Sequence, residues 1–133
     1  MRYARVVAAF GVLGCVGPAV AHHSFSAEFD KDKRAVFTGV VTKVDWANPH
    51  TYFFLNVTGK DGRVVNWTFE AAGPNLLNRL GWSRDSLKVG DRITVVGYLP
   101  WTPDVRVASA RAVVLADGRK VYAATPKDNG PLP

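Results

Sequence analysis

The sequence predicts an all-β domain with one short helix, and three observations point to it. Several stretches rich in β-branched and aromatic residues alternate in polarity and are separated by glycine-containing turns. One short helical segment lies between the third and fourth of these stretches. Three strands, a helix and then two strands is the chain order of the OB-fold, a five-stranded Greek-key barrel.

The first strand is expected at residues 35–46, where Gly39 indicates a bulge or a bend. Its alternation places four apolar side chains on one face, namely Val36, Val40, Val44 and Trp46. The remaining strands are expected at residues 51–58, 63–70, 92–99 and 105–115, with a short last strand through Val121 and Tyr122. A glycine-rich turn at residues 59–62 makes the second and third strands a hairpin.

The helix is expected at residues 75–80, because Pro74 favours its first turn and Gly81 its end. Its apolar stripe would close one end of the barrel, through Leu76, Leu77 and Leu80. With 133 residues the chain is long enough for one domain. The predicted organisation is a signal peptide at residues 1–21, an extended arm at 22–34, the barrel at 35–124 and a flexible, solvated tail at 125–133.

The first 21 residues have the features of a secretory signal. Arg2 and Arg5 precede an apolar run, and Ala19-Val20-Ala21 has the small residues that signal peptidase recognises. We therefore expect a periplasmic or secreted protein with no transmembrane span after processing. An alternative is lipidation at Cys15, because Val12-Leu13-Gly14-Cys15 resembles a lipobox.

Cleavage after Ala21 lowers the formal net charge from +6 to +4, since only Arg2 and Arg5 leave with the leader. This mild basicity permits an acidic partner without requiring one. The same cleavage removes Cys15, the single cysteine, so the mature chain has neither disulfides nor a thiol nucleophile.

The three histidines of the sequence lie in two places, His22-His23 and His50. If His22 is the first residue, its amine and imidazole chelate a cation, and His50 would complete a histidine brace, which suits copper. If Ala21 is first, the Ala-His-His start offers the nitrogen set used for Cu(II) or Ni(II). Zinc is a further candidate, and the partner expected from this site is a divalent metal ion. The competing interpretation is that the two N-terminal histidines are a flexible spacer.

His50 follows Asn48 and Pro49, and the proline makes this corner stiff. In an OB-fold the corner lies at the rim of the binding face, so Asn48 is a candidate contact as well. A plainer interpretation is a turn in which Asn48 caps the backbone and His50 bonds locally. Four acidic residues are candidate oxygen ligands or partners of the histidines, and the spacing selects none of them: Glu28, Asp30, Asp45 and Glu70.

Trp101 lies in the loop before the last long strand and is the best candidate for an exposed aromatic contact. Trp46 and Trp67 alternate in phase with apolar neighbours and are expected in the core. Export argues against nucleic acid, so this alternative predicts an envelope component, such as a glycan, a peptide or a protein. Catalysis has the least support, because no nucleophile elbow, phosphate loop, paired cysteine motif or HExxH is present.

An ordered set of short motifs runs through the chain. It comprises Ala21-His22-His23-Ser24, Trp46-Ala47-Asn48-Pro49-His50, Asn66-Trp67 and Glu70 before a Gly-Pro-Asn helix start. In this set the chain resembles a bacterial family of small exported proteins of unknown function. The resemblance covers residues 22–123 and implies a periplasmic or secreted single domain. It places six residues on motif positions, namely His22, His23, Asn48, Pro49, His50 and Glu70, and it implies no activity.

Overall fold

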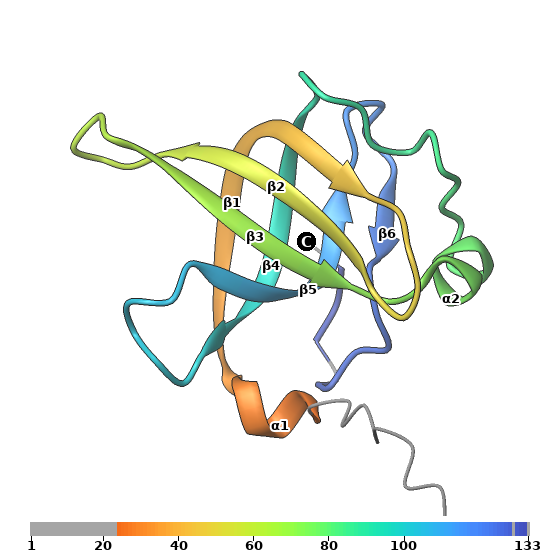
Figure 1. Cartoon of the computed structure of the whole chain (residues 1–133), viewed down its shortest axis with the longest axis horizontal. Helices are drawn as coiled ribbons and strands as arrows, with labels where there is room; N and C mark the ends of the chain where they lie inside the picture. Colours follow the sequence, from red (N-terminus) through yellow and green to blue (C-terminus); the bar gives the residue numbers. More distant parts are fainter. Residues whose placement is uncertain (1–23, 129, 133) are drawn as a thin grey trace, which may run out of the picture.

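Six β-strands form one sheet that closes into a ring (Figure 1). The computed structural model describes residues 24–128 and 130–132. The elements in chain order are α1 (Phe25–Glu28), β1 (Phe29–Asp45), β2 (Thr51–Thr58), β3 (Val64–Ala71), α2 (Pro74–Arg79), β4 (Arg92–Pro100), β5 (Val107–Val114) and β6 (Lys120–Tyr122). The sheet order is β3-β2-β1-β4-β5-β6, and a parallel pairing of β3 with β5 closes it. This confirms the predicted OB-fold-like barrel.

The long strand β1 forms both walls of the ring. Its first part, Phe29 to Val40, pairs with β4, and its second part, Gly39 to Asp45, pairs with β2. The strands cross closely at Gly39, where an added Cβ would lie 2.5 Å from the carbonyl oxygen of Asn56. A glycine is therefore required at position 39 because the β2 backbone comes so close, and not because the strand bulges there.

The bulge lies further along β1. Because of it, the predicted buried face of this strand is wrong for the first half of the strand. The pairing with β2 shifts between Val41 and Lys43. Before the shift, Phe37 and Val41 are buried, whereas Val36 is 68% exposed. After it, Val44 packs against the core. The extra residue moves the alternation by one position, which a regular period of two does not anticipate.

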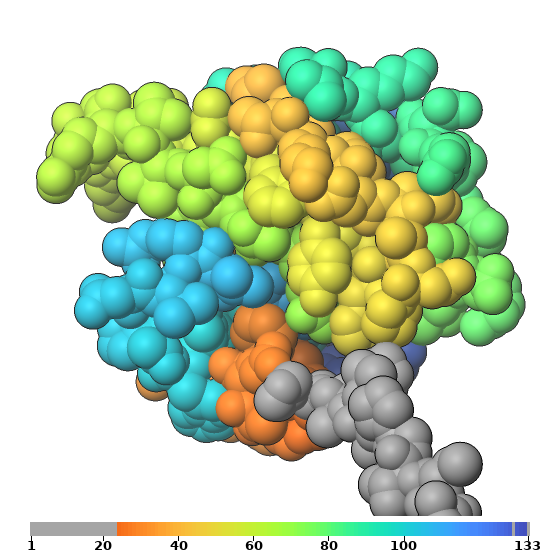
Figure 2. Space-filling model, viewed as in Figure 1, coloured from red at the N-terminus to blue at the C-terminus, as the bar shows by residue number. Residues whose placement is uncertain are grey.

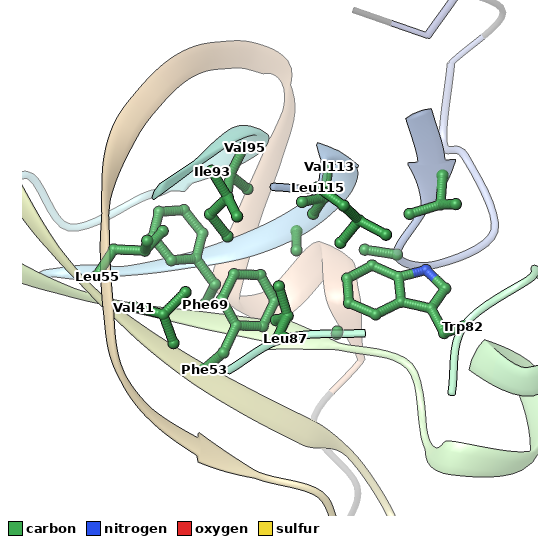
Figure 3. Packing of buried hydrophobic residues seen from close by; sticks show 14 of the residues in the cluster. Val41, Phe53, Leu55, Phe69, Trp82, Leu87, Ile93, Val95, Val113 and Leu115 are labelled. Atoms are coloured by element: carbon green, nitrogen blue, oxygen red, sulfur yellow. The ribbon is translucent and has the colours of Figure 1, made fainter. Parts of the chain in front are cut away.

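The core lies inside the ring and combines aromatic with aliphatic side chains (Figure 3). The rings of Phe53 and Phe69, opposite each other on β2 and β3, stack with centroids 5.3 Å apart. Leu77 of α2 is fully buried and closes one end of the barrel, as expected. Trp82 follows α2 into the core, where its indole N–H donates to the carbonyl of Tyr122 at 2.7 Å.

The arm before the barrel contributes more structure than the sequence suggested. The first strand begins at Phe29 and not near Ala35, and a second short helix, α1, precedes it. Phe29 pairs with Pro100, and regular pairing resumes only at Arg34, so residues 30–33 are looped out between them. The side chain of Phe29 is buried against the barrel, which explains why the arm is fixed there.

The tail after Thr125 is not the free, solvated end that its composition suggested. Arg111 on β5 is 1% exposed, and its guanidinium forms a salt bridge of 3.0 Å with Asp128. The same guanidinium donates to the carbonyls of Gly130 and Pro131, and the Tyr98 phenol donates to Asp128 at 2.7 Å. A buried cation requires partners, and the tail supplies them. We call this cluster the Arg111 latch.

Replacing Asp128 by Asn should destabilise the fold, because it removes the charge that compensates the buried guanidinium of Arg111. We expect the free energy of unfolding to fall by about 1–3 kcal/mol, measured by urea denaturation. Asp117→Asn is the matched control, because Asp117 pairs with Arg119 at 2.8 Å but both side chains are more than half exposed. Its effect on the free energy of unfolding should be much smaller, because solvent screens an exposed ion pair.

Acid provides a second test of the same latch. Burial raises the pKa of Asp128. Hydrogen bonds from Tyr98, the Gly130 amide and Arg111 lower this pKa by more than burial raises it, and the result is a pKa of about 2. Since an unfolded aspartate has a pKa of about 3.9, this stabilisation is complete above about pH 4 and is lost as the pH falls toward 2. The stability difference between wild type and Asp128→Asn should shrink across this window, and a constant difference would contradict the latch.

Candidate functional site

The β1–β2 corner positions His50 at one end of the barrel (Figure 1). The peptide bond between Asn48 and Pro49 is cis. Gly73, which precedes α2, lies directly against this corner, because an added Cβ there would be 2.5 Å from the Pro49 carbonyl oxygen. The corner is thus held between the end of β1 and the start of α2, and His50 enters β2 from a packed position.

Glu70 is the partner of His50. The imidazole Nδ1 lies 3.0 Å from Glu70 Oε1, and the other carboxylate oxygen accepts a hydrogen bond of 3.3 Å from the phenol of Tyr52. Tyr52 and Glu70 are paired across β2 and β3, and His50 lies two residues before Tyr52. Alternate residues of a strand share a face, so the β-ladder itself brings the three side chains together.

A cavity of about 220 Å³ opens beside this pair. Its walls come from α1, the end of β3, α2, β5 and the tail. Its polar lining includes Glu28, His50, Glu70 and Lys127, and its apolar lining includes Phe25, Phe29 and Leu76. The side chains of His50 and Glu70 are 36% and 21% exposed, so both remain accessible to a small ligand.

The electrostatics of the cavity are governed by its carboxylates. Burial raises the pKa of the Tyr52 phenol, and the negative charge of Glu70, the hydrogen bond to Glu70 and the charge of Glu28 raise it further. Tyr52 therefore remains a protonated hydrogen-bond donor at neutral pH. Its hydrogen bond engages one oxygen of Glu70, while the other oxygen lies 3.0 Å from His50 Nδ1.

The sequence-predicted site residues are only partly brought together. His50 and Glu70 are in contact, whereas Asn48 is exposed at the corner and is not part of the cavity lining. Trp101 is 53% exposed on the β4–β5 loop and lines other hollows of the surface. His22 and His23 lie outside the described residues.

Two of the other acidic candidates have different partners. Asp30 lies 3.4 Å from Lys33, and Asp45 lies 2.6 Å from Lys43. Among residues 24–128 and 130–132, no group of three or more His, Cys, Asp or Glu side chains is arranged to hold a metal ion. Within this part of the chain, His50 and Glu70 do not by themselves form a complete metal site.

Sequence reasoning missed Tyr52 and Lys127 as members of the site. For Tyr52 a signal existed, because a hairpin turning at residues 59–62 sets the register that places Tyr52 opposite Glu70. The same register would have selected Glu70 from the acidic candidates. For Lys127 no local signal exists, because the Arg111 latch brings the tail to the cavity from the end of the chain.

Replacing Glu70 by Gln should lower the pKa of the Tyr52 phenol toward the ordinary tyrosine value of about 10. The reason is that the substitution removes the negative charge next to the phenol while burial stays the same. Titration of the Tyr52 ring carbon signal by NMR measures this. Asp61→Asn, in the hairpin turn, is the control and should leave the titration unchanged; an equal change in both variants would show that Glu70 does not govern Tyr52.

No helix among the described residues has the length and hydropathy to cross a membrane.

Comparison with known proteins places the chain in a family. No curated protein and no solved structure matches the chain. A family model described as a family of unknown function (DUF6152) matches residues 10–102, a range that includes His50, Glu70 and Trp101. The chain therefore belongs to this family of unknown function.

Proposed function

We propose that this protein is an exported, periplasmic binding module that holds a copper-like divalent cation through His50 together with His22 and His23. The observation that carries the proposal is the contact of 3.0 Å between His50 Nδ1 and Glu70 Oε1. A histidine that ligates a metal through one ring nitrogen commonly donates its other N–H to a carboxylate. The His50–Glu70 pair has this arrangement, in which Nε2 is the nitrogen left for the metal.

The covalent chain supports a shared site with the N-terminal histidines. Phe25 and Glu28 line the same cavity as His50. Consecutive Cα atoms are 3.8 Å apart, so the Cα of His23 is within about 7.6 Å of that of Phe25, and the Cα of His22 within about 11.4 Å. The length of the chain between Phe25 and these histidines therefore permits both of them to reach the cavity that Phe25 lines.

The chemistry of the ligands favours copper over harder cations. Imidazole and amine nitrogens suit Cu, Ni and Zn, whereas Mg and Ca prefer oxygen ligands. A chain that begins at His22 adds its terminal amine to three imidazoles. A chain that begins at Ala21 replaces this set by the amine, amide and imidazole nitrogens of the Ala-His-His start. His50 supplies a ligand from the barrel in the first form, whereas in the second the nitrogens of the N-terminal start fill the square plane.

Replacing His50 by Ala should weaken Cu(II) binding by about 100-fold, and Glu70→Gln, which removes only the orienting carboxylate, by about 10- to 100-fold. Competition titration of the chain purified from the periplasm without chelators measures both, and native mass spectrometry reports the N-terminus and the bound ion. Asp61→Asn is the control and should bind copper as wild type does.

Two outcomes would contradict the proposal. Unchanged copper affinity of His50→Ala would show that the barrel contributes no ligand, so that any site would lie in the arm alone. A mature chain that begins with a lipidated Cys15 has no free amine at His22, and the brace would be excluded.

We propose, as a second candidate function, an interaction module of the envelope that binds a glycan, peptide or protein partner on its loop face. The specific observation is Trp101, which is 53% exposed although it is a large apolar side chain. Its indole N–H donates to the carbonyl of Ser26 at 3.1 Å, so the ring is fixed in its exposed position. Fixed, exposed indoles are frequent anchors of binding surfaces.

Replacing Trp101 by Ala should reduce retention of the protein on isolated envelope material by about tenfold, because the anchor is lost. Val89→Ala is the control, since Val89 is 70% exposed and lies in the turn before β4. Co-sedimentation with cell-wall and membrane fractions measures retention. Equal retention of wild type and Trp101→Ala would count against the loop face.

A further inference from the structure

Lys127 is the one lysine or arginine among the described residues that line the His50 cavity, and the tail carries it there. The tail runs from the end of β6 toward α1 (Figure 1). The backbone N–H of Lys127 donates to the Tyr98 hydroxyl at 3.1 Å, and this hydroxyl donates to Asp128 at 2.7 Å. The ammonium of Lys127 lies 5.5 Å from the ring centroid of Phe25, which lines the same cavity. The fold thus fixes the backbone of Lys127 beside the cavity and places its charge over an aromatic wall.

No ion pair joins Lys127 to a carboxylate within the part of the chain that the structure describes. The two oxygens of Glu70 are engaged elsewhere, since one lies 3.0 Å from His50 Nδ1 and the other accepts from Tyr52 at 3.3 Å. The side chain of Lys127 is exposed at the cavity wall. Its ammonium is therefore available to an anion that enters the cavity.

The charges around the cavity decide when an anion can enter. Glu28 and Glu70 contribute two negative charges and Lys127 one positive charge, so the described lining has a sum of −1 with His50 neutral. An empty cavity therefore disfavours an anion. A divalent cation held at His50 by neutral nitrogens changes the sum to +1, which one monoanion neutralises. The inference rests on the proposed function, because the cation comes from it.

The size of the cavity leaves room for a second ligand beside the cation. One water requires only about 10–15 Å³, whereas the cavity has about 220 Å³. Its walls combine the hydroxyls of Ser109 and Thr125 with apolar side chains, among them Phe29 and Leu76. Figure 2 shows the orange surface of α1 below the yellow surface of the β1–β2 corner, the two segments that supply Glu28 and His50. A ligand with one charged end and a short hydrocarbon part matches this lining.

We propose that the cation-loaded His50 cavity binds a short-chain monocarboxylate, whose carboxylate pairs with the ammonium of Lys127. A charge-assisted hydrogen bond from an ammonium to a carboxylate is stronger than a bond between neutral groups. The hydrocarbon part packs against the apolar walls and excludes water from them. A dianion such as sulfate is disfavoured, because it would bring the charge of the loaded cavity back to −1.

Butyrate and butyramide test the inference on the full mature chain loaded with one equivalent of Cu(II), since the two probes differ chiefly in charge. We expect butyrate to bind about tenfold more tightly than butyramide in calorimetry, because only butyrate forms a charged pair with Lys127. Butyrate should bind the copper-free chain at least about tenfold more weakly than the loaded chain, because the lining alone is negative.

Reciprocity supplies an independent measurement. If copper strengthens butyrate binding about tenfold, saturating butyrate must strengthen Cu(II) binding by the same factor. Competition titration of copper with and without butyrate measures this factor. Butyramide at the same concentration is the control and should leave the copper affinity unchanged.

Matched variants locate the interaction. Lys127→Gln should weaken butyrate binding about tenfold, and it should leave binding of butyramide unchanged. Cu(II) binding without butyrate should not weaken, because the substitution removes a like charge and no ligand. Lys60→Gln makes the same change of charge in the exposed hairpin turn and should bind all three as wild type does.

Equal affinity for butyrate and butyramide, or equal butyrate affinity of Lys127→Gln and Lys60→Gln, would overturn the inference. If copper affinity in that case still depended on His50, the proposed function would stand without this ligand class. A chain that binds no copper would remove the proposed function, and the inference would fall with it.

Discussion

Closure of the ring by β3 and β5 is the constraint on which the candidate site depends. The two strands run parallel for three residue pairs, Thr68 with Val107, Phe69 with Ala108 and Glu70 with Ser109. The fully buried β5 residues Ala108, Ala110 and Ala112 are small, so β5 can approach its neighbours closely. Glu70 is consequently held between Tyr52 on one side and Ser109 on the other. The position of its carboxylate is set by backbone pairing and not by a flexible loop, which is the rigidity that an orienting partner of a histidine needs.

The two ends of the chain complete the site by packing against this closed ring. The buried guanidinium of Arg111 holds the tail, and the held tail brings Thr125 and Lys127 to the wall of the His50 cavity. On the other side, the buried Phe29 fixes the arm, so that Phe25 and Glu28 form a second wall. The cavity is therefore built from segments that are distant in sequence. Its shape depends on nonlocal contacts, which are lost together when the fold opens.

The local parts of the structure were predictable from the sequence, and the nonlocal parts were not. Alternation and turn residues gave β2 at its observed bounds and the neighbouring β3 and α2 within one residue at each end. Alternation failed on β1, because the bulge after Val41 changes the face without a residue that marks it. The polar composition of the tail predicts a solvated end, whereas its structure is decided by the contact of Asp128 with Arg111, seventeen residues earlier. The contact of His50 with Glu70 was partly predictable. The hairpin register places Glu70 opposite Tyr52, two residues after His50, although no motif indicates the contact itself.

The distribution of charge around the barrel differs from what the net charge of the chain indicates. The mature chain is expected at +4, which permits an acidic partner without requiring one. Among the described residues that line the His50 cavity there are nevertheless two acidic side chains, Glu28 and Glu70, and one lysine. By contrast, Lys33 lies over the indole of Trp101, and Arg106 over that of Trp67. The short helix α1 contacts both regions, because it lines the His50 cavity and its Ser26 carbonyl accepts a hydrogen bond from Trp101. A single turn of helix thus connects a cavity lined by carboxylates with a surface where cations lie over indoles.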